Sequence, residues 1–156
     1  MKNAIFSSII LCLVFVTSCK KTDTKPFINT WSFLGNNYTV ESSWRSLTVA
    51  EIQTTGYDSV TGAKAYLNVY FYGSYPTNGG SYRIVTGTSP AAADEIAIIY
   101  SNSASQYYAL GTDNVNAGVS VTSAGKIQVI IPPVLMQNAH LPIDNYRTLS
   151  ATVGDK

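Results

Sequence analysis

Few side chains in this sequence could carry out acid–base or nucleophilic chemistry. The only histidine, His140, lies in a loop-like stretch, and a histidine that acts as a general base needs an orienting carboxylate and a nucleophile. The sequence shows neither, because Asp144 is near in sequence but nearness within a loop does not establish geometry. Asp94 and Glu95 are adjacent, so in a strand their side chains would face opposite sides of the sheet. Distant carboxylates such as Glu41 and Glu51 could pair as in a glycosidase, but any chain with nine acidic residues offers that freedom. We therefore expect no catalytic residues and no enzymatic activity.

Metal and cofactor sites have still fewer candidates. A single histidine cannot supply a three-histidine zinc site, and the two cysteines, Cys12 and Cys19, both lie near the start of the chain. The sequence also lacks the glycine-rich loop with Lys and Ser or Thr that cradles a phosphate. It therefore predicts no metal site and no cofactor, and no disulfide after residue 19.

The first residues have the order of a secretory signal. Lys2 supplies an early positive charge, and an apolar run from Ala4 to Val16 follows it. A helix that crosses the hydrocarbon core needs about 20 apolar residues. This run has 13 positions, two of them serine. We therefore expect residues 1–18 to be a cleaved signal peptide rather than a permanent membrane span.

The end of this signal, Val16-Thr17-Ser18-Cys19, resembles the lipobox of bacterial lipoproteins, in which an aliphatic and two small residues precede a cysteine. The resemblance implies that Cys19 gains a diacylglyceryl thioether, that the signal is cut before it, and that the new N-terminus is acylated, typically with palmitate. Two or more acyl chains anchor a protein stably, whereas a single chain binds only marginally. The resemblance thus implies a lipid anchor in a membrane of the cell envelope, which we expect to be the outer membrane of a Gram-negative bacterium. It leaves open which side of that membrane the domain faces.

The chain from residue 19 to 156 has the size and composition of one domain that meets neutral partners. Its 138 residues suffice for a single core. Without Lys2, nine basic residues balance nine acidic ones, and charged residues form only 12% of the whole chain against a usual ~25%. No basic stripe exists to neutralise phosphates, so we expect no nucleic-acid binding. Ser and Thr make up 29 of these residues, a content typical of extracytoplasmic β domains.

Short alternating segments predict an all-β domain over residues 31–156, preceded by a flexible tether over 19–30. Turn signals recur about every 8 to 12 residues, which indicates a single antiparallel β-sandwich or small flattened β-barrel of about eight strands. A coil of about ten residues has an r.m.s. reach of roughly 17 Å, so the tether keeps the domain close to the bilayer. The expected strands cover residues 38–40, 46–52, 65–73, 81–85, 95–100, 106–111, 118–122, 126–131 and 146–153.

Glycine and proline mark the expected turns. We expect strand 46–52 to end before Gly56, and Asn78-Gly79-Gly80 to form a hairpin, because these residues tolerate positive φ. Pro132-Pro133 should end strand 126–131, because proline donates no ladder hydrogen bond. Ser89-Pro90 is a fair beginning for one helical turn at most.

Tyrosines supply the candidate contact residues. Tyr66, Tyr70 and Tyr72 share one face of strand 65–73, and apolar side chains occupy the other face. Exposed, they would form a platform on which sugar rings stack; turned inward, they would line a ligand cavity; packed on their neighbours, they would only stabilise the sheet. The leading hypothesis is a non-catalytic domain that binds a glycan or an envelope protein through these three residues. We expect Trp31 and Trp44 to lie in the core, because of their size.

One short motif suggests a modification. Asp58-Ser59-Val60 resembles the Asp-Ser/Thr-apolar motif that some Gram-negative bacteria O-glycosylate on exported proteins. It lies in an expected loop between Gly56 and Gly62, which suits a modifying enzyme. The resemblance implies O-glycosylation of Ser59.

A second resemblance offers an alternative function. Asn29-Thr30-Trp31 looks like the Gly-x-Trp opening of lipocalin-like proteins, although Asn29 replaces the glycine and no C-terminal helix follows the last strand. That family is an eight-stranded up-and-down barrel with an apolar ligand inside. The alternative is therefore a carrier of a small apolar ligand.

The lipid anchor can be tested by substitution of each cysteine. We expect Cys19→Ala to abolish incorporation of labelled palmitate and to move the protein out of the membrane fraction, because the thiol is the acceptor of the lipid. Cys12→Ala, inside the expected signal, should change neither result. A Cys19→Ala protein that still takes up palmitate would rule out this anchor.

Overall fold

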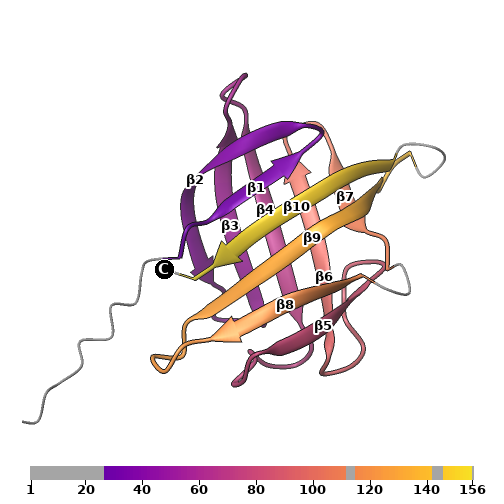
Figure 1. Cartoon of the computed structure of the whole chain (residues 1–156). Helices are drawn as coiled ribbons and strands as arrows, with labels where there is room; N and C mark the ends of the chain where they lie inside the picture. Colours follow the sequence, from indigo (N-terminus) through magenta and orange to yellow (C-terminus); the bar gives the residue numbers. More distant parts are fainter. Residues whose placement is uncertain (1–26, 112–114, 142–145, 156) are drawn as a thin grey trace, which may run out of the picture.

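The fold is one closed sheet of ten strands, with no helix among the residues that the structure describes. The structure, a computed structural model, describes residues 27–111, 115–141 and 146–155 (Figure 1). The strands are β1 (Thr30–Phe33), β2 (Asn36–Arg45), β3 (Glu51–Asp58), β4 (Lys64–Phe71), β5 (Gly80–Val85), β6 (Glu95–Asn102), β7 (Gln106–Ala109), β8 (Asn116–Val121), β9 (Ile127–Asn138) and β10 (Tyr146–Gly154).

Strand pairing runs around a ring. β10, β1, β2, β3, β4 and β6 are neighbours in that order, and each of these pairs is antiparallel. β7 bridges β6 and β9 at one end of the barrel, and the antiparallel pair β5–β8 bridges them at the other end. β9 pairs with β10, which completes the ring (Figure 1). The expected all-β class is confirmed, with ten strands instead of about eight and with β5 parallel to β6.

Side-chain alternation separates the interior of the barrel from its outer surface. In β4, Ala65, Leu67, Val69 and Phe71 are buried, and the residues between them are half-buried on the outer side. The same alternation recurs in β9 and β10. It follows from the pleat, which turns successive side chains to opposite faces. The hydrophobic core is therefore the interior of the barrel.

Aromatic side chains fill much of this interior. The ring of Phe33 lies 4.0 Å from that of Tyr100 and 4.9 Å from that of Tyr107, centre to centre. The hydroxyls of Tyr38 and Tyr100 are hydrogen-bonded at 2.9 Å, and the ring of Tyr38 stacks on Trp31 at 5.3 Å. Burial is the main cause that raises the pKa of Tyr38 well above its ordinary value. This tyrosine is therefore neutral at physiological pH, as a buried hydroxyl with a hydrogen-bond partner should be.

Gly56 is a packing residue inside β3, so the expected end of a strand before it is wrong. The turn lies instead at residues 46–50, and β3 runs from Glu51 to Asp58. A Cβ on Gly56 would lie 2.7 Å from Cη2 of Trp31 and 2.9 Å from the carbonyl oxygen of Thr39. Only glycine lets the indole and the neighbouring backbone approach so closely.

The prolines of β9 do not end that strand, contrary to the expectation. β9 continues through Pro132-Pro133 to Asn138. On one edge of β9, pairing with β8 extends only to Ile130 and pairing with β7 begins only at Met136. The prolines between them therefore have no pairing partner on that edge. On the other edge they form a bulge in β9, because Pro132 and Pro133 together oppose the single residue Ser150 of β10. Proline is tolerated at such positions because no ladder hydrogen bond is lost.

The hairpin expected at Asn78-Gly79-Gly80 is also wrong. β4 and β5 are not paired, because β6 lies between them. Neither glycine has a positive φ. A Cβ on Gly79 would lie 2.9 Å from the carbonyl oxygen of Val119 in β8, so this glycine permits close packing of two backbones rather than a tight turn.

The two tryptophans differ in their placement. Trp31 is buried, as expected. The expectation for Trp44 is wrong, because its side chain is 48% exposed. A register shift between Val40 and Ser42 in the pairing of β2 with β3 precedes it, and Trp44 then lies opposite half-buried Gln53 on the outer face. A bulge changes which side chains of a strand face the core, and local alternation does not reveal it.

Only part of the expected N-terminal region belongs to the described residues, which begin at Phe27. The signal and the lipobox, including Cys19, lie outside them. Asn29, which the sequence analysis assigns to the tether, is buried, and its side-chain amide bonds both the N–H and the carbonyl oxygen of Gly154 at 2.7 and 2.9 Å. Across the described ranges, no helix is long and apolar enough to cross a membrane.

The close packing of Gly56 gives a matched pair of substitutions. We expect Gly56→Ala to lower the free energy of unfolding by about 1–3 kcal/mol, because the added methyl group overlaps the ring of Trp31 and the carbonyl oxygen of Thr39. Gly118→Ala in β8 meets open space, so it should change stability by less than about 0.5 kcal/mol. Chemical denaturation of both variants measures the difference, and equal stabilities would contradict the packing role.

Candidate functional site

An open cleft of about 430 Å³ lies at the end of the barrel where β4 finishes. Its walls come from the β4–β5 connection, the first half of β5 and the residues before β6. The residues that line it are Phe71, Tyr72, Ser74, Tyr75, Pro76, Thr77, Asn78, Gly79, Gly80, Ser81, Tyr82, Ala93 and Asp94. It combines aromatic rings with small polar side chains, and we treat it as the candidate site.

Aromatic side chains form the apolar part of the cleft. Phe71 is buried, with the ring of Tyr75 at 6.2 Å and that of Tyr82 at 6.1 Å from it, the latter edge-on. Tyr75 and Tyr82 are half-buried, whereas Tyr72 is 51% exposed. The cleft thus offers one open ring beside two partly covered ones.

Short polar side chains surround the rings. Ser74, Thr77 and Ser81 carry exposed hydroxyls, and Asn78 carries an exposed amide. Among the described residues that line the cleft, Asp94 has the only charged side chain. The rim can therefore donate and accept several hydrogen bonds, and it offers one carboxylate and no cation of its own.

Tyr75 joins the cleft to the turn between β2 and β3. Its hydroxyl accepts the N–H of Glu51 at 3.1 Å and lies 2.6 Å from the carbonyl oxygen of Glu51 and 2.9 Å from that of Ser46. The guanidinium carbon of Arg45 lies 5.0 Å from the centre of its ring. Burial raises the pKa of Tyr75, so the hydroxyl stays protonated and able to donate.

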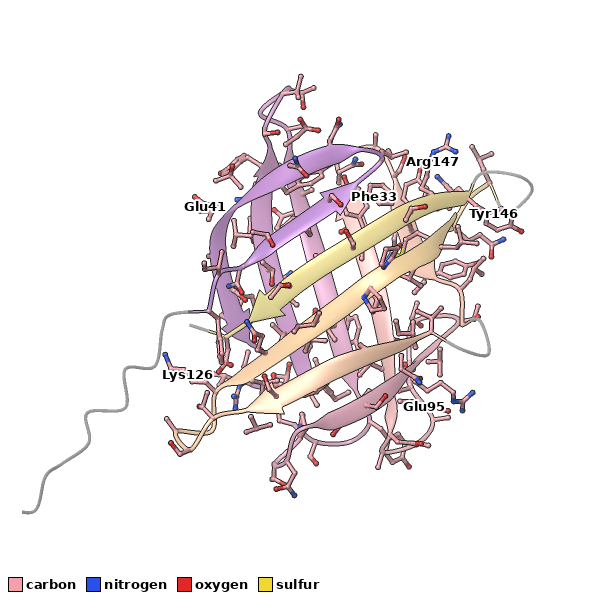
Figure 2. All side chains as sticks on the ribbon, viewed as in Figure 1. Phe33, Glu41, Glu95, Lys126, Tyr146 and Arg147 are labelled. Carbon is pink, nitrogen blue, oxygen red and sulfur yellow. The ribbon has the colours of Figure 1, made fainter. Side chains whose placement is uncertain are left out.

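Glu95 supports the opposite wall of the cleft. Its buried carboxylate accepts the backbone N–H groups of Ala91 and Ala92 at 2.7 and 3.0 Å and pairs with Arg83. Figure 2 shows Glu95 beside β5 at this end of the barrel. The carboxylate therefore organises the β5–β6 connection in place of the helical turn expected at Ser89-Pro90, which the structure does not form. These contacts occupy both carboxylate oxygens.

The three predicted contact tyrosines occupy two different places. Tyr72 lines the cleft, whereas Tyr66 and Tyr70 lie half-buried on the outer face of β4. The Tyr70 hydroxyl accepts a hydrogen bond from the amide nitrogen of Asn68 at 3.2 Å, and burial raises its pKa. On β6, Ile99 faces outward opposite Asn68 and is still buried. Tyr66 and Tyr70 lie two residues to either side of Asn68, so both are diagonal neighbours of Ile99 on the outer face. Aromatic side chains reach such neighbours, and we infer that these two rings cover Ile99.

His140 and Glu95 do not meet. His140 lines a polar cleft with the β6–β7 turn, at the far end of β6 from Glu95. The backbone N–H of His140 donates to the side-chain oxygen of Asn138. In the part of the chain that the structure describes, no group of three or more His, Cys, Asp or Glu side chains is arranged to hold a metal ion.

Asp58, in the motif that resembles a glycosylation site, accepts three hydrogen bonds that hold the turn after β3. Its carboxylate accepts the N–H of Thr61 at 2.9 Å, the N–H of Val60 at 2.8 Å and the amide of Asn36 at 2.7 Å. The bond from Thr61 contributes most to the lowering of the pKa of Asp58. Ser59 is exposed in the turn after β3. Its O-glycosylation stays a prediction.

Tyr72 is the only one of the three predicted contact tyrosines that lines the cleft, and the other residues of the cleft are not predicted contacts. Tyr75, Tyr82 and Asp94 all line it together with Tyr72. Their only sequence signal is that Tyr75 and Tyr82 flank the Asn78-Gly79-Gly80 stretch. Alternation could not place them, because they lie in or beyond a connection between strands that are not neighbours.

Comparison with known proteins does not assign this chain to a family. No family model matches the chain, and no curated protein or solved structure is detectably similar to it.

The hydroxyl of Tyr75 gives a local stability prediction. We expect Tyr75→Phe to speed hydrogen exchange of the Glu51 amide and to lower the free energy of unfolding by about 0.5–1.5 kcal/mol, because the turn loses its brace. Tyr82→Phe, which leaves the brace intact, is the control. Unchanged exchange at Glu51 in Tyr75→Phe would show that the turn is held by its backbone alone.

Proposed function

We propose that this protein is a cell-envelope lipoprotein, anchored through acylated Cys19, whose barrel binds a neutral glycan without catalysing a reaction. The observation that carries the proposal is the cleft with an exposed Tyr72 ring, two further tyrosines and a rim of hydroxyl and amide groups. Sugar rings present apolar C–H faces and polar hydroxyl edges, and this cleft offers a matching surface for each.

The size and charge of the cleft support this class of ligand. Its volume of about 430 Å³ lies within the range of about 300–1,000 Å³ that is typical of small-molecule sites. Asp94 would accept hydrogen bonds from sugar hydroxyls and would repel an acidic glycan. The absence of a cation among the described lining residues points the same way. A neutral or amino sugar therefore fits better than a uronic acid or a phosphate.

The arrangement of ionisable groups supports a binding role over catalysis. The Glu95 carboxylate is committed to Ala91, Ala92 and Arg83, and Asp94 is the only carboxylate among the described lining residues. A glycosidase of the usual kind needs two carboxylates across the scissile bond.

The alternative carrier function has less support. Phe33, Tyr100 and Tyr107 occupy positions inside the barrel that an enclosed ligand would need. A second cleft, of about 390 Å³, opens over β1, β2 and β10, and most of the described residues that line it are Ser, Thr or Asn. An envelope protein as partner remains the second possibility within the binding hypothesis, and no described contact favours it.

Glycan binding can be tested by substitution of tyrosines in two places. We expect neutral polysaccharides in affinity gels to retard the wild-type domain, and Tyr72→Ala or Tyr82→Ala to weaken binding roughly tenfold, because each removes a stacking ring. Tyr66→Ala, on the outer face of β4, should bind as the wild type does.

The reverse pattern would move the site. Binding that is lost in Tyr66→Ala or Tyr70→Ala and kept in Tyr72→Ala would place the glycan on the outer face of β4. If no neutral polysaccharide retards the wild-type domain, the glycan proposal fails. Thermal denaturation of each variant excludes loss of fold as the cause.

A further inference from the structure

The turn between β2 and β3, residues 46–50, presents apolar side chains to solvent. Leu47 is fully exposed, Val49 is 50% exposed, and Trp44 just before the turn is 48% exposed. The segment Ser46-Leu47-Thr48-Val49-Ala50 has no charged residue. We call Trp44, Leu47 and Val49 the apolar tip.

The apolar tip stands on a well-braced turn. The N–H of Ser46 donates to the carbonyl oxygen of Glu51 at 2.9 Å, and the N–H of Phe71 donates to that of Ala50 at 2.8 Å. The Tyr75 hydroxyl also bonds the carbonyl oxygens of Ser46 and Glu51. Leu47 is therefore held outward by a defined backbone, and its exposure does not depend on an unanchored loop. A rigidly displayed leucine is costly in water and suits contact with an apolar phase.

The apolar tip lies at the end of the barrel where the chain enters and leaves. Nε of Arg45, which precedes the turn, lies 2.8 Å from the Asp155 carboxylate, and its guanidinium also bonds the carbonyl oxygen of Gly125. Gly154, next to Asp155, bonds Asn29 at the start of the domain. Figure 1 shows the ends of β2 and β10 and the start of β1 together at this end.

The length of chain before the domain fixes how far this end can lie from a lipid anchor. Eight residue steps separate Cys19 from Phe27, so they span at most about 29 Å even when fully extended. β9 alone has 12 residues, about 40 Å of strand, so the opposite end lies farther from the anchor by most of the length of the barrel. Any bilayer that holds Cys19 is thus nearer to the end of the barrel that carries the apolar tip than to the opposite end.

Lys126 and the lysines of the tether supply positive charge at this end, against the carboxylates of Glu51 beside the turn and Asp94 in the cleft. Lys126 is exposed beside the point where the chain enters (Figure 2). The sequence of the tether has Lys20, Lys21 and Lys25 against a single Asp23. Each lysine near an anionic leaflet adds attraction. The Asp155 carboxylate, which would oppose it, is paired with Arg45.

We propose that the apolar tip inserts into the interface of the membrane that holds the lipid anchor, so that the barrel stands on the bilayer with this end down. The inference rests on the membrane attachment of the proposed function. The cleft lies at the same end of the barrel, because Phe71 and Tyr75 bond the turn, so a glycan in the cleft would be bound close to the bilayer surface. Its chemistry is that of interfacial proteins, in which a few apolar side chains enter the boundary between headgroups and acyl chains and basic residues meet the headgroups.

The test supplies the anchor chemically, so that it does not depend on lipidation in the cell. The chain from residue 19 to 156 is coupled through the Cys19 thiol to a maleimide lipid in vesicles of phosphatidylethanolamine and phosphatidylglycerol. In a Trp44→Phe background, Leu47→Trp places a tryptophan in the turn. Leu141→Trp places one at the far end, where Leu141 is 60% exposed. Buried Trp31 gives the same background emission in both.

We expect brominated lipids to quench roughly half of the Leu47→Trp emission and to shift it to shorter wavelength, because an inserted ring lies at the depth of the upper acyl chains. Leu141→Trp should emit as it does in buffer. Equal quenching of the two variants, or none in Leu47→Trp, overturns the proposal. A shift in Leu47→Trp that depends on protein concentration and not on bromine would instead show contact between copies of the chain, and it also overturns the proposal.

A second measurement uses the native tryptophan. With Trp44 in place, Leu47→Asp should remove most of the quenching of Trp44 by brominated lipids, and Leu141→Asp should not. If coupled vesicles behave as expected while Cys19→Ala leaves palmitate labelling intact in cells, the apolar tip stands and the proposed anchor fails.

Discussion

The aromatic side chains that fill the inside of the barrel determine where a ligand can bind and how closely the strands around them must pack. Phe33, Tyr100 and Tyr107 contact one another across the interior, and the hydroxyl pair of Tyr38 and Tyr100 satisfies two buried polar groups. Because rings fill this space, a ligand must bind at the surface or at an end. The same crowding explains Gly56, the position in β3 against which the Trp31 ring packs. Binding and stability thus depend on one packing arrangement.

The parts of the fold that depend on neighbouring residues could be predicted. The alternation of β4 correctly separated Leu67 and Val69 from Tyr66 and Tyr70, because the pleat acts within a few residues. Predictions that depend on distant residues failed. Gly56 is needed because of Trp31 in another strand, and Pro132-Pro133 is tolerated because β7, β8 and the bulge opposite β10 leave that stretch unpaired.

The candidate site shows the same division. Tyr72 could be singled out from its strand, but its partnership with Tyr82 and Asp94 arises because β6 is inserted between β4 and β5. That insertion makes the β4–β5 connection cross the end of the barrel, and nothing in the local pattern of residues 72–82 indicates it. The role of Glu95 could not be predicted either. Its carboxylate accepts the N–H groups of Ala91 and Ala92, in a segment whose sequence favours the start of a helix.

The pairing of the first strand with the last has a consequence for biosynthesis. Ser32 of β1 bonds Ser150 of β10 across 118 positions, and Asn29 bonds Gly154 across 125. In a chain exported from its N-terminus, β1 leaves the translocation channel first and must wait for β10, which leaves last. Contacts so distant in sequence carry a large loop-closure entropy and slow folding. In such a chain the ring closes only after β10 has emerged, and until then the unpaired edge of β1 needs protection from other chains.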